Sequence, residues 1–306
     1  MAKYIIKRIF ISILTALVLV TAVWILVRFL PGDPFTSEKL SPEVKANMMK
    51  YYGFDKPILT QYTTYMKNLL RGDLGYSLNY KNLTVNRILK DSFPYSADLG
   101  MRSLAFSVSI GLFLGIIAAL NRGRFLDYFC IILAILGSSI PDFIIGSLLQ
   151  YGFGVKLKVL PIAQWQSFRH TILPSVALGF YTLAHISRVM RASMLEVVNQ
   201  DYIKTAHSKG LSQPKIVIKH QIRNAILPII TILGPMIASI LTGTFVIESI
   251  YAIPGMGKYY VSGVQTLDYT LILGSTIFYG VLLILANTVV DILYGIIDPR
   301  IRIYKS

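Results

Sequence analysis

Cysteine is almost absent from this 306-residue sequence, and acidic residues are scarce. The single cysteine, Cys130, lies inside an apolar run, so neither a disulfide framework nor a thiolate metal cluster can form within the chain. The four histidines do not stand three to five residues apart, which argues against a local zinc site. We therefore expect no metal to be bound by this chain.

Catalytic motifs are lacking as well. Gly257-Lys258 resembles the end of a phosphate-binding loop, but Tyr259 stands where Ser or Thr is required, and Ala252 stands where the first Gly belongs. No Gly-x-Ser-x-Gly motif is present, which argues against a serine hydrolase. We therefore expect no catalytic residues, no ATP site and no bound cofactor. A membrane protease remains an alternative at this point, because its dyad can be scattered in sequence.

Negative charge is the third scarcity: 15 Asp and Glu face 30 Lys and Arg, giving a net charge of +15. Half of the basic residues fall in four segments that flank apolar runs, namely residues 3–8, 122–124, 188–223 and 300–305. This distribution is typical of the cytoplasmic ends of membrane helices. No basic stripe alternates with aromatic residues, so nucleic-acid binding is not predicted.

Hydrophobic residues, by contrast, are abundant at 54%, and the mean hydropathy is +0.58. These values favour a membrane protein over a soluble domain. We predict an all-α polytopic membrane protein that forms one transmembrane domain over residues 1–306. An even number of helices places both termini in the cytoplasm. The six predicted spans cover residues 9–30, 99–120, 127–152, 172–195, 225–247 and 269–292.

Residues 31–95 differ in composition, carrying Lys, Asp, Asn, Tyr and Gly with only weak apolar periodicity. We predict an extracytoplasmic insertion between the first two spans, helical in parts. Helix starts are expected at Ser41, followed by Pro42, and near Pro57. Asn82 heads a glycosylation sequon, a pattern that also arises easily by chance.

Two spans carry residues that constrain their neighbours. Gly111 and Gly115 stand four residues apart and can allow another helix to approach closely. Pro141 and Asp142 fall near the middle of the third span, where proline frees a backbone carbonyl and a carboxylate is unfavourable in lipid. This stretch should face protein or water.

Polar groups within the spans are candidates for a solute pathway, although each could instead satisfy a neighbouring helix. Arg188 and Arg191 could also line a cavity, but basic residues near a helix end more often extend to the interface. The pathway candidates are Ser138, Ser139, Asp142, Gln150, His185, Asn287 and Asp291.

The polar loop of residues 196–225 contains a short helix with start and stop signals. Asp201 is predicted to cap its N-terminus, and Gly210 suits the left-handed position that ends a helix. Ser212 and Pro214 then predict a second helix start. An isolated helix of about eight residues is marginal in water. We therefore expect a partner protein to order it.

One face of this short helix carries Tyr202, Ala206 and Lys209 at helical spacing, with Thr205 beside them. An aromatic anchor surrounded by small residues can lie in a groove of another protein. A solvated loop that merely obeys the positive-inside rule explains the spacing equally well.

The stretch from Asp201 to Ser212 resembles the cytoplasmic "EAA" loop of binding-protein-dependent ABC importer permeases, in its peptide-permease form. Residues 28–34, 245–257 and 291–300 resemble further stretches of the same family, so the resemblance spans the chain. It is most similar to the B-type permease subunit of oligopeptide importers. One departure is that Pro228 follows Gly210 by 18 residues, a longer separation than in the general pattern.

The resemblance implies a type I ABC importer permease fold in a bacterial cell membrane, among membrane lipid. It also implies a second homologous permease, two cytoplasmic ATPases that use ATP and Mg, and an extracellular binding protein that delivers peptide. The short helix would be the coupling helix, which drives alternating access. Its implied coupling residues are Asp201, Tyr202, Ile203, Thr205, Ala206, Lys209, Gly210 and Leu211.

Other solutes and mechanisms remain open from the sequence. Within the family, dipeptides, nickel chelates or another small solute could replace oligopeptides, because the binding protein usually selects the substrate. Outside it, a self-sufficient secondary transporter would require buried ionisable groups at mid-span, which only Asp142 clearly provides. An intramembrane enzyme would act on a membrane substrate when purified alone.

Overall fold

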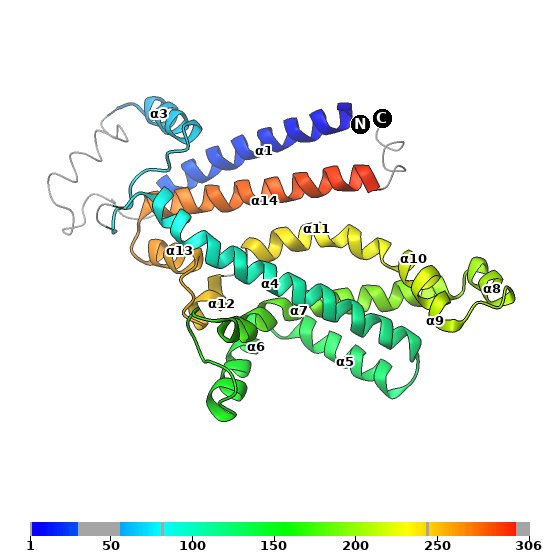
Figure 1. Cartoon of the computed structure of the whole chain (residues 1–306). Coiled ribbons are helices and arrows are strands. Elements are labelled where there is room, and N and C mark those ends of the chain that lie inside the picture. The colour runs from blue at the N-terminus through cyan, green and yellow to red at the C-terminus, as the bar shows by residue number, and fades with distance from the viewer. Residues whose placement is uncertain (1, 30–55, 81–82, 243–244, 298–306) are drawn as a thin grey trace. The chain divides into compact units, whose positions relative to one another are not determined.

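Helices make up most of the described residues in the computed structural model (Figure 1). The structure describes residues 2–29, 56–80, 83–242 and 245–297, and within these ranges the only strand-like pairing is an isolated bridge between Tyr76 and Thr84. The predicted helix start at Ser41, the sequon at Asn82 and the basic end after Asp298 lie outside the described residues.

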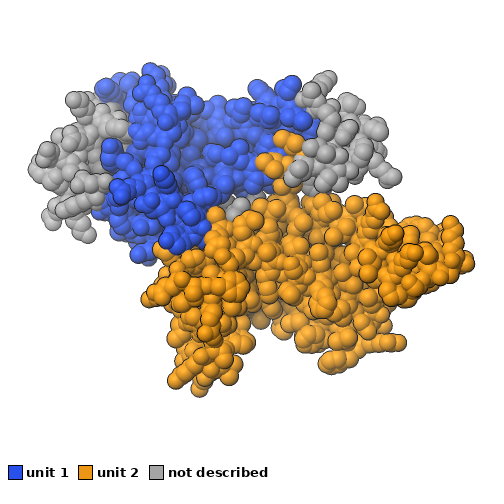
Figure 2. All heavy atoms as spheres, viewed as in Figure 1, with its two compact units in different colours: residues 1–95, 255–288 blue, residues 96–254, 289–306 orange. Residues whose placement is uncertain are grey.

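The chain groups into two compact units (Figure 2). The first combines Met1–Tyr95 with Gly255–Thr288, and the second combines Ser96–Pro254 with Val289–Ser306. The division falls inside two long helices, α4 (Val85–Leu120) and α14 (Tyr269–Ile297).

Four helices are long and apolar enough to cross a membrane, and two bent helix pairs raise the number to six if each pair is one span. The predicted all-α polytopic architecture is therefore confirmed among the described residues. The four continuous helices are α1 (Ala2–Arg28), α4, α7 (Phe168–Val198) and α14.

In the first unit, α1 and α14 lie side by side (Figure 1). Trp24 of α1 and Ile277 of α14 are buried in one apolar cluster, to which α3 (Ile58–Leu70) contributes Tyr65. α3 begins directly after Pro57, where the sequence predicts a helix start, because proline's fixed φ suits the entry to a helix.

In the same unit, the buried carboxylate of Asp268 joins the start of α14 to the loop between α3 and α4. Asp268 is fully buried, and its Oδ1 accepts the backbone N–H of Leu271 at 3.0 Å, in the first turn of α14. Its Oδ2 accepts the N–H of Leu78 at 2.9 Å and the hydroxyl of Ser77. The carboxylate therefore caps α14 and also fixes the loop between α3 and α4. The sequence gives no indication of the neighbouring helix α13 (Met256–Gln265).

The second predicted span begins earlier than expected. We expect it to start at residue 99, but α4 starts at Val85 and runs for 36 residues. Residues 85–95, which the prediction places in the insertion that is helical in parts, are therefore helical and continuous with the second span. Pro94 lies inside α4 without ending it, and one turn before it the Ser92 hydroxyl donates to the Ile88 carbonyl at 2.6 Å.

α7 is the centre of the second unit. The helices that contact it are α5 (Phe125–Ser139), α6 (Asp142–Leu149), α10 (Arg223–Ala225), α11 (Leu227–Thr242) and α12 (Phe245–Ile250). Many of its small and apolar residues are buried, so α7 acts as the helix on which the others pack.

α4 also packs closely on α7, through glycine. A Cβ added to Gly111 would lie 2.9 Å from the Leu183 carbonyl oxygen, and one added to Gly115 would lie 2.7 Å from Cβ of Met190. The hydroxyl of Ser107 donates to the Gly179 carbonyl at 2.7 Å between the same helices. The predicted close approach at the Gly-x-x-x-Gly sequence is therefore confirmed, and α7 is the partner helix.

The third predicted span is broken where the sequence places Pro141 and Asp142. α5 and the segment from Asp142 to Lys156, which ends in the π-helical turn η1 (Gln150–Lys156), meet at 111°. The hydroxyl of Tyr251 donates to the Gly146 carbonyl at 2.8 Å and holds α6 in place. Burial raises the pKa of Tyr251, so this phenol stays neutral and remains a donor.

The fifth predicted span also starts earlier than expected. Helical structure begins with α9 (Gln213–Ile216), continues through the π-helical turn η2 (Val217–Ile222) and α10, and meets α11 at a bend of 48°. The predicted start at residue 225 misses this segment because its exposed polar residues resemble a loop. Pro228 falls near the bend, since proline's ring disturbs the preceding turn.

Candidate functional site

The short helix predicted in the polar loop is α8 (Asp201–Ser208), eight residues long. Its capping residue is Gln200, not Asp201 as predicted, and Gln200 makes no side-chain capping bond. Asp201 occupies the first helical position, where its charge favours the helix N-terminus and its carboxylate pairs with Lys204 at 2.9 Å. Both side chains are highly exposed, so this ion pair contributes little to stability.

Gly210 ends α8 as predicted, with a φ of +70°. The Leu211 N–H bonds to the Ala206 carbonyl at 3.3 Å, and the Gly210 N–H bonds to the His207 carbonyl at 2.9 Å. These two bonds define a Schellman motif, in which the left-handed residue is usually glycine. Leu211 is partly buried against the cluster that contains Ala206, which supplies the apolar contact of the motif.

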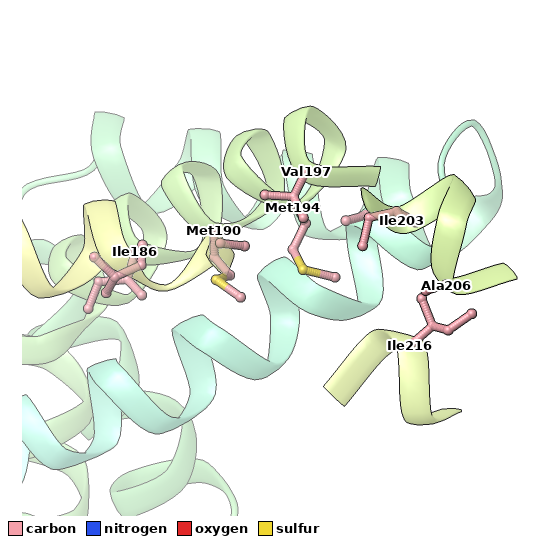
Figure 3. Packing of buried hydrophobic residues seen from close by; sticks show 10 residues of the cluster. Ile186, Met190, Met194, Val197, Ile203, Ala206 and Ile216 are labelled. Atoms are coloured by element: carbon pink, nitrogen blue, oxygen red, sulfur yellow. The ribbon is translucent and has the colours of Figure 1, made fainter. Parts of the chain in front are cut away.

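The inner face of α8 packs on its own chain (Figure 3). Ile203 is 2% exposed and Ala206 is 5% exposed. They belong to a group that we call the α7–α8 cluster: Ala119, Ile186, Met190, Met194, Val197, Ile203, Ala206, Ile216, Ala225 and Ile229. α8 thus obtains from α7 and α9 the tertiary contacts that an eight-residue helix lacks alone, contrary to the expectation that a partner must order it.

The outer face of α8 is polar and accessible. Tyr202 is 43% exposed, and Thr205 and Lys209 are also exposed. The predicted face of Tyr202, Ala206 and Lys209 must therefore be corrected: Ala206 points into the α7–α8 cluster, while the other two remain available to a partner. The shift follows from the helical period, because Ile203 and Ala206 stand three residues apart and share the apolar side.

An ion pair braces α7 near α8. Arg191 donates from Nε to Asp127 Oδ1 at 2.6 Å and from Nη2 to Oδ2 at 2.8 Å. The Gly123 N–H donates to the same carboxylate at 2.9 Å. Asp127 is 2% exposed, so the pair ties the start of α5 to α7. Arg191 is thus held in an ion pair that the sequence analysis did not predict, whereas Arg188 is exposed.

A cavity of about 380 Å³, lined by both polar and apolar side chains, opens at the break between α5 and α6. It brings together three of the predicted pathway residues, Ser138, Ser139 and Asp142. The rest of its lining is Ile140, Pro141, Leu178, Tyr181, Thr182, Ser239 and Ile240. Asp142 is the one charged side chain of this lining.

The remaining pathway candidates lie elsewhere. Gln150 donates to the carbonyls of Ile162 and Ile250, at 2.8 and 3.2 Å, and so holds loops together. His185 stacks on Tyr181 but does not line the cavity. Asn287 and Asp291 belong to α14.

The sequence analysis does not identify Tyr181, Thr182 and Ser239 as cavity residues. Tyr181 and Thr182 precede His185 by about one helical turn, so the same α7 stripe that suggested His185 could have indicated them. Ser239 carries no such signal, because only the packing of α11 on α7 brings it to the cavity.

Together, the fold and these sites define a multi-pass helical membrane protein with a cavity of mixed polar and apolar lining at a broken helix. Residues 111–303 match the family described as "Binding-protein-dependent transport system inner membrane component", and residues 1–100 match the N-terminal part of such components. The chain belongs to this family of membrane permease components of ABC transporters.

Relatives that match along the whole chain agree with this family assignment. The chain is 48% identical over 307 residues to the dipeptide transport system permease protein DppB of Bacillus subtilis, with 100% of both chains covered. It is 43% identical to the oligopeptide transport system permease protein OppB of Haemophilus influenzae and 42% identical to that of Escherichia coli. Each of these matches covers 99% of this chain and 100% of the relative.

Solved structures support the fold. A permease-containing structure described as inward-facing conformations of the MetNI methionine ABC transporter matches with a TM-score of 0.54 at 17% identity. The match covers 69% of this chain and 94% of that one. An amino acid ABC transporter matches with the same TM-score at 14% identity, covering 68% and 93%. The predicted type I importer permease fold is therefore confirmed.

Proposed function

We propose that this chain is a permease subunit of an ATP-driven importer that takes up oligopeptides delivered by an extracellular binding protein. Relatives of similar length are named as peptide permeases, and the family is that of binding-protein-dependent systems. The hydroxyl and carboxylate groups in the cavity at the α5–α6 break support passage of a solute with hydrogen-bonding groups.

The observation that carries the proposal is the packing of α8. Tyr202 and Lys209 are exposed on one side, while Ile203 and Ala206 are held in the α7–α8 cluster on the other. A partner that moved α8 would therefore also move α7, the helix on which the second unit packs. Well-packed interiors transmit such displacements because they have little free volume.

In the proposed complex, α8 is the coupling helix and lies in a cleft of one of two cytoplasmic ATPases. A second homologous permease completes the pathway, and both termini of this chain are cytoplasmic. The basic residues near α8 and those before the first apolar run support that orientation under the positive-inside rule. The ATPases bind ATP and Mg, and closure of the ATPases switches the pathway between its inward- and outward-facing states.

Dipeptides are the second candidate substrate. The relative at 48% identity is named as a dipeptide permease, whereas those at 42–43% are named as oligopeptide permeases. The two alternatives share the same coupling mechanism and differ only in the length of peptide that is carried.

Uptake by the reconstituted complex tests the proposal. Proteoliposomes containing both permeases and both ATPases, supplied with the binding protein, receive labelled peptides of two to eight residues. The expected result is uptake that requires ATP and the binding protein and extends to peptides beyond two residues. Uptake limited to dipeptides would select the second candidate. Uptake driven by an ion gradient without ATP would refute both.

A further inference from the structure

The cavity at the α5–α6 break is lined by one acidic side chain and by no basic ones. Asp142 is its one charged side chain, and no Lys, Arg or His belongs to its lining. Oδ1 of Asp142 accepts the Phe143 N–H at 2.9 Å, while Oδ2 has no hydrogen-bond partner among the residues that the structure describes. The chain has a net charge of +15, yet this cavity presents a carboxylate with no basic side chain among its lining residues. Asp142 stands in the first turn of α6, whose N-terminus favours the ionised carboxylate.

The end of α5 brings partial negative charge to the helix break, beside the N-terminus of α6. α5 ends at Ser139, and the C-terminus of a helix carries a partial negative charge. Pro141 has no N–H, so it cannot supply the bond that the Gly137 carbonyl would receive in a continuous helix. Backbone acceptors of the last turn of α5 and the Asp142 carboxylate therefore meet at the same place.

Hydroxyl groups surround this negative centre. Ser138 and Ser139 come from α5, Tyr181 and Thr182 from α7, and Ser239 lies on α11. Hydroxyls can both donate and accept, so they suit a ligand with alternating N–H and C=O groups. Ile140, Leu178 and Ile240 complete the lining with apolar surface. A volume of about 380 Å³ falls within the usual size range of a small-ligand site.

From this arrangement we infer that the cavity binds the positively charged amino-terminal group of the transported peptide. Asp142 supplies the opposite charge, and the hydroxyls of the lining form hydrogen bonds with the backbone of the peptide. The inference rests on the proposed peptide import. A free ammonium group supplies three donors, which match the carboxylate and the nearby backbone acceptors. The permease itself therefore discriminates between peptides with a free and a blocked amino terminus, in addition to any selection by the binding protein.

The test compares one labelled tripeptide with its N-acetylated form, in proteoliposomes of the whole complex with the binding protein saturated by each peptide. The binding protein is identical in every arm, so its own preference cancels when variants are compared. Asp142→Asn is expected to lower uptake of the free peptide by about tenfold or more, because hydrogen bonds to charged groups contribute about 1.5–3 kcal/mol. Uptake of the acetylated peptide should stay unchanged.

Asp91→Asn is the matched control, because it removes an exposed carboxylate of α4 that does not line the cavity. It should leave the ratio of free to acetylated uptake as in the wild type. Tyr181→Phe removes one lining hydroxyl and keeps the ring. It should lower the uptake of both peptides without changing their ratio.

The possible outcomes separate the inference from the proposed function. If the wild-type complex takes up no peptide, peptide import itself fails. If it takes up peptide and Asp142→Asn shows the wild-type ratio, the inference is overturned and Asp142 is only a first-turn residue of α6. Should Asp142→Asn not assemble, Asp142→Ser makes the same test, since it removes the charge and keeps an oxygen that can accept the Phe143 N–H. An unchanged ratio in that variant overturns the inference as well.

Discussion

Removing the side chain that anchors α8 is the most direct test of how this helix is held. Ile203 is 2% exposed in the α7–α8 cluster, and Ile203→Ala deletes three buried carbon atoms. Such substitutions in a packed core destabilise by about 2–5 kcal/mol. α8 contributes only two buried residues, Ile203 and Ala206, so the lower end of this range applies. A loss of about 2 kcal/mol raises the population of detached α8 roughly 30-fold.

Hydrogen exchange and transport coupling measure this effect together. In the purified complex, exchange of the α8 amides should accelerate roughly 30-fold in Ile203→Ala, while the amides of α4 keep their protection. The number of peptides transported per ATP hydrolysed should fall. Ile203→Val removes a single methylene and should give an intermediate result, because it costs about 0.5–1.5 kcal/mol.

A matched control is available on the neighbouring turn η2. Ile218 is 66% exposed, so Ile218→Ala makes the same chemical change without opening a cavity. It should behave like the wild type in both measurements. If Ile203→Ala leaves the exchange of α8 unchanged, the packing argument is refuted. If exchange accelerates and the peptide-to-ATP ratio stays constant, α8 does not couple the ATPases to the pathway.

Three further substitutions test other parts of the structure. Gly115→Leu should abolish stable assembly, because its Cβ alone would lie 2.7 Å from Cβ of Met190 in α7. Gly152→Leu should be tolerated, since no atom lies within 4 Å of a Cβ added there. Size-exclusion profiles in detergent compare the two variants. Arg191→Met should lower the stability of the folded protein by about 3–5 kcal/mol, because it leaves the buried Asp127 carboxylate unpaired. Adding Asp127→Leu to this variant should restore most of the lost thermal stability. A double variant no more stable than the single one would contradict this account. Gly210→Asn should keep transport near normal, since asparagine tolerates a φ of +70°. Gly210→Glu should uncouple ATP hydrolysis from uptake. Near-normal uptake by a well-expressed Gly210→Glu variant would count against the coupling role.

Local sequence chemistry was sufficient wherever one residue imposes the structure on its own. Gly210 predicts the left-handed end of α8, Pro57 predicts the start of α3, and the pair Pro141-Asp142 predicts a disturbed span. In each case, the backbone preference of the residue acts over a single turn. The apolar runs likewise predict the membrane helices, because lipid demands long stretches without charge.

Helix boundaries were less predictable where polar residues are helical. α4 begins at Val85 rather than near residue 99, and α9 begins at Gln213 rather than near residue 225. Exposed polar residues are compatible with both helix and loop, so hydropathy marks the apolar part of a helix and not its end. α13 was missed for the same reason.

By itself, the sequence determined a helical membrane protein, the break at Pro141 and the position of α8, since composition and backbone preference act locally. Only the tertiary structure decided which side of α8 is buried, that Arg191 pairs with Asp127 across 64 positions, and that Ser239 joins Asp142 at one cavity. These are relations between segments distant in the chain. They depend on how helices pack on α7, and no local pattern specifies that packing.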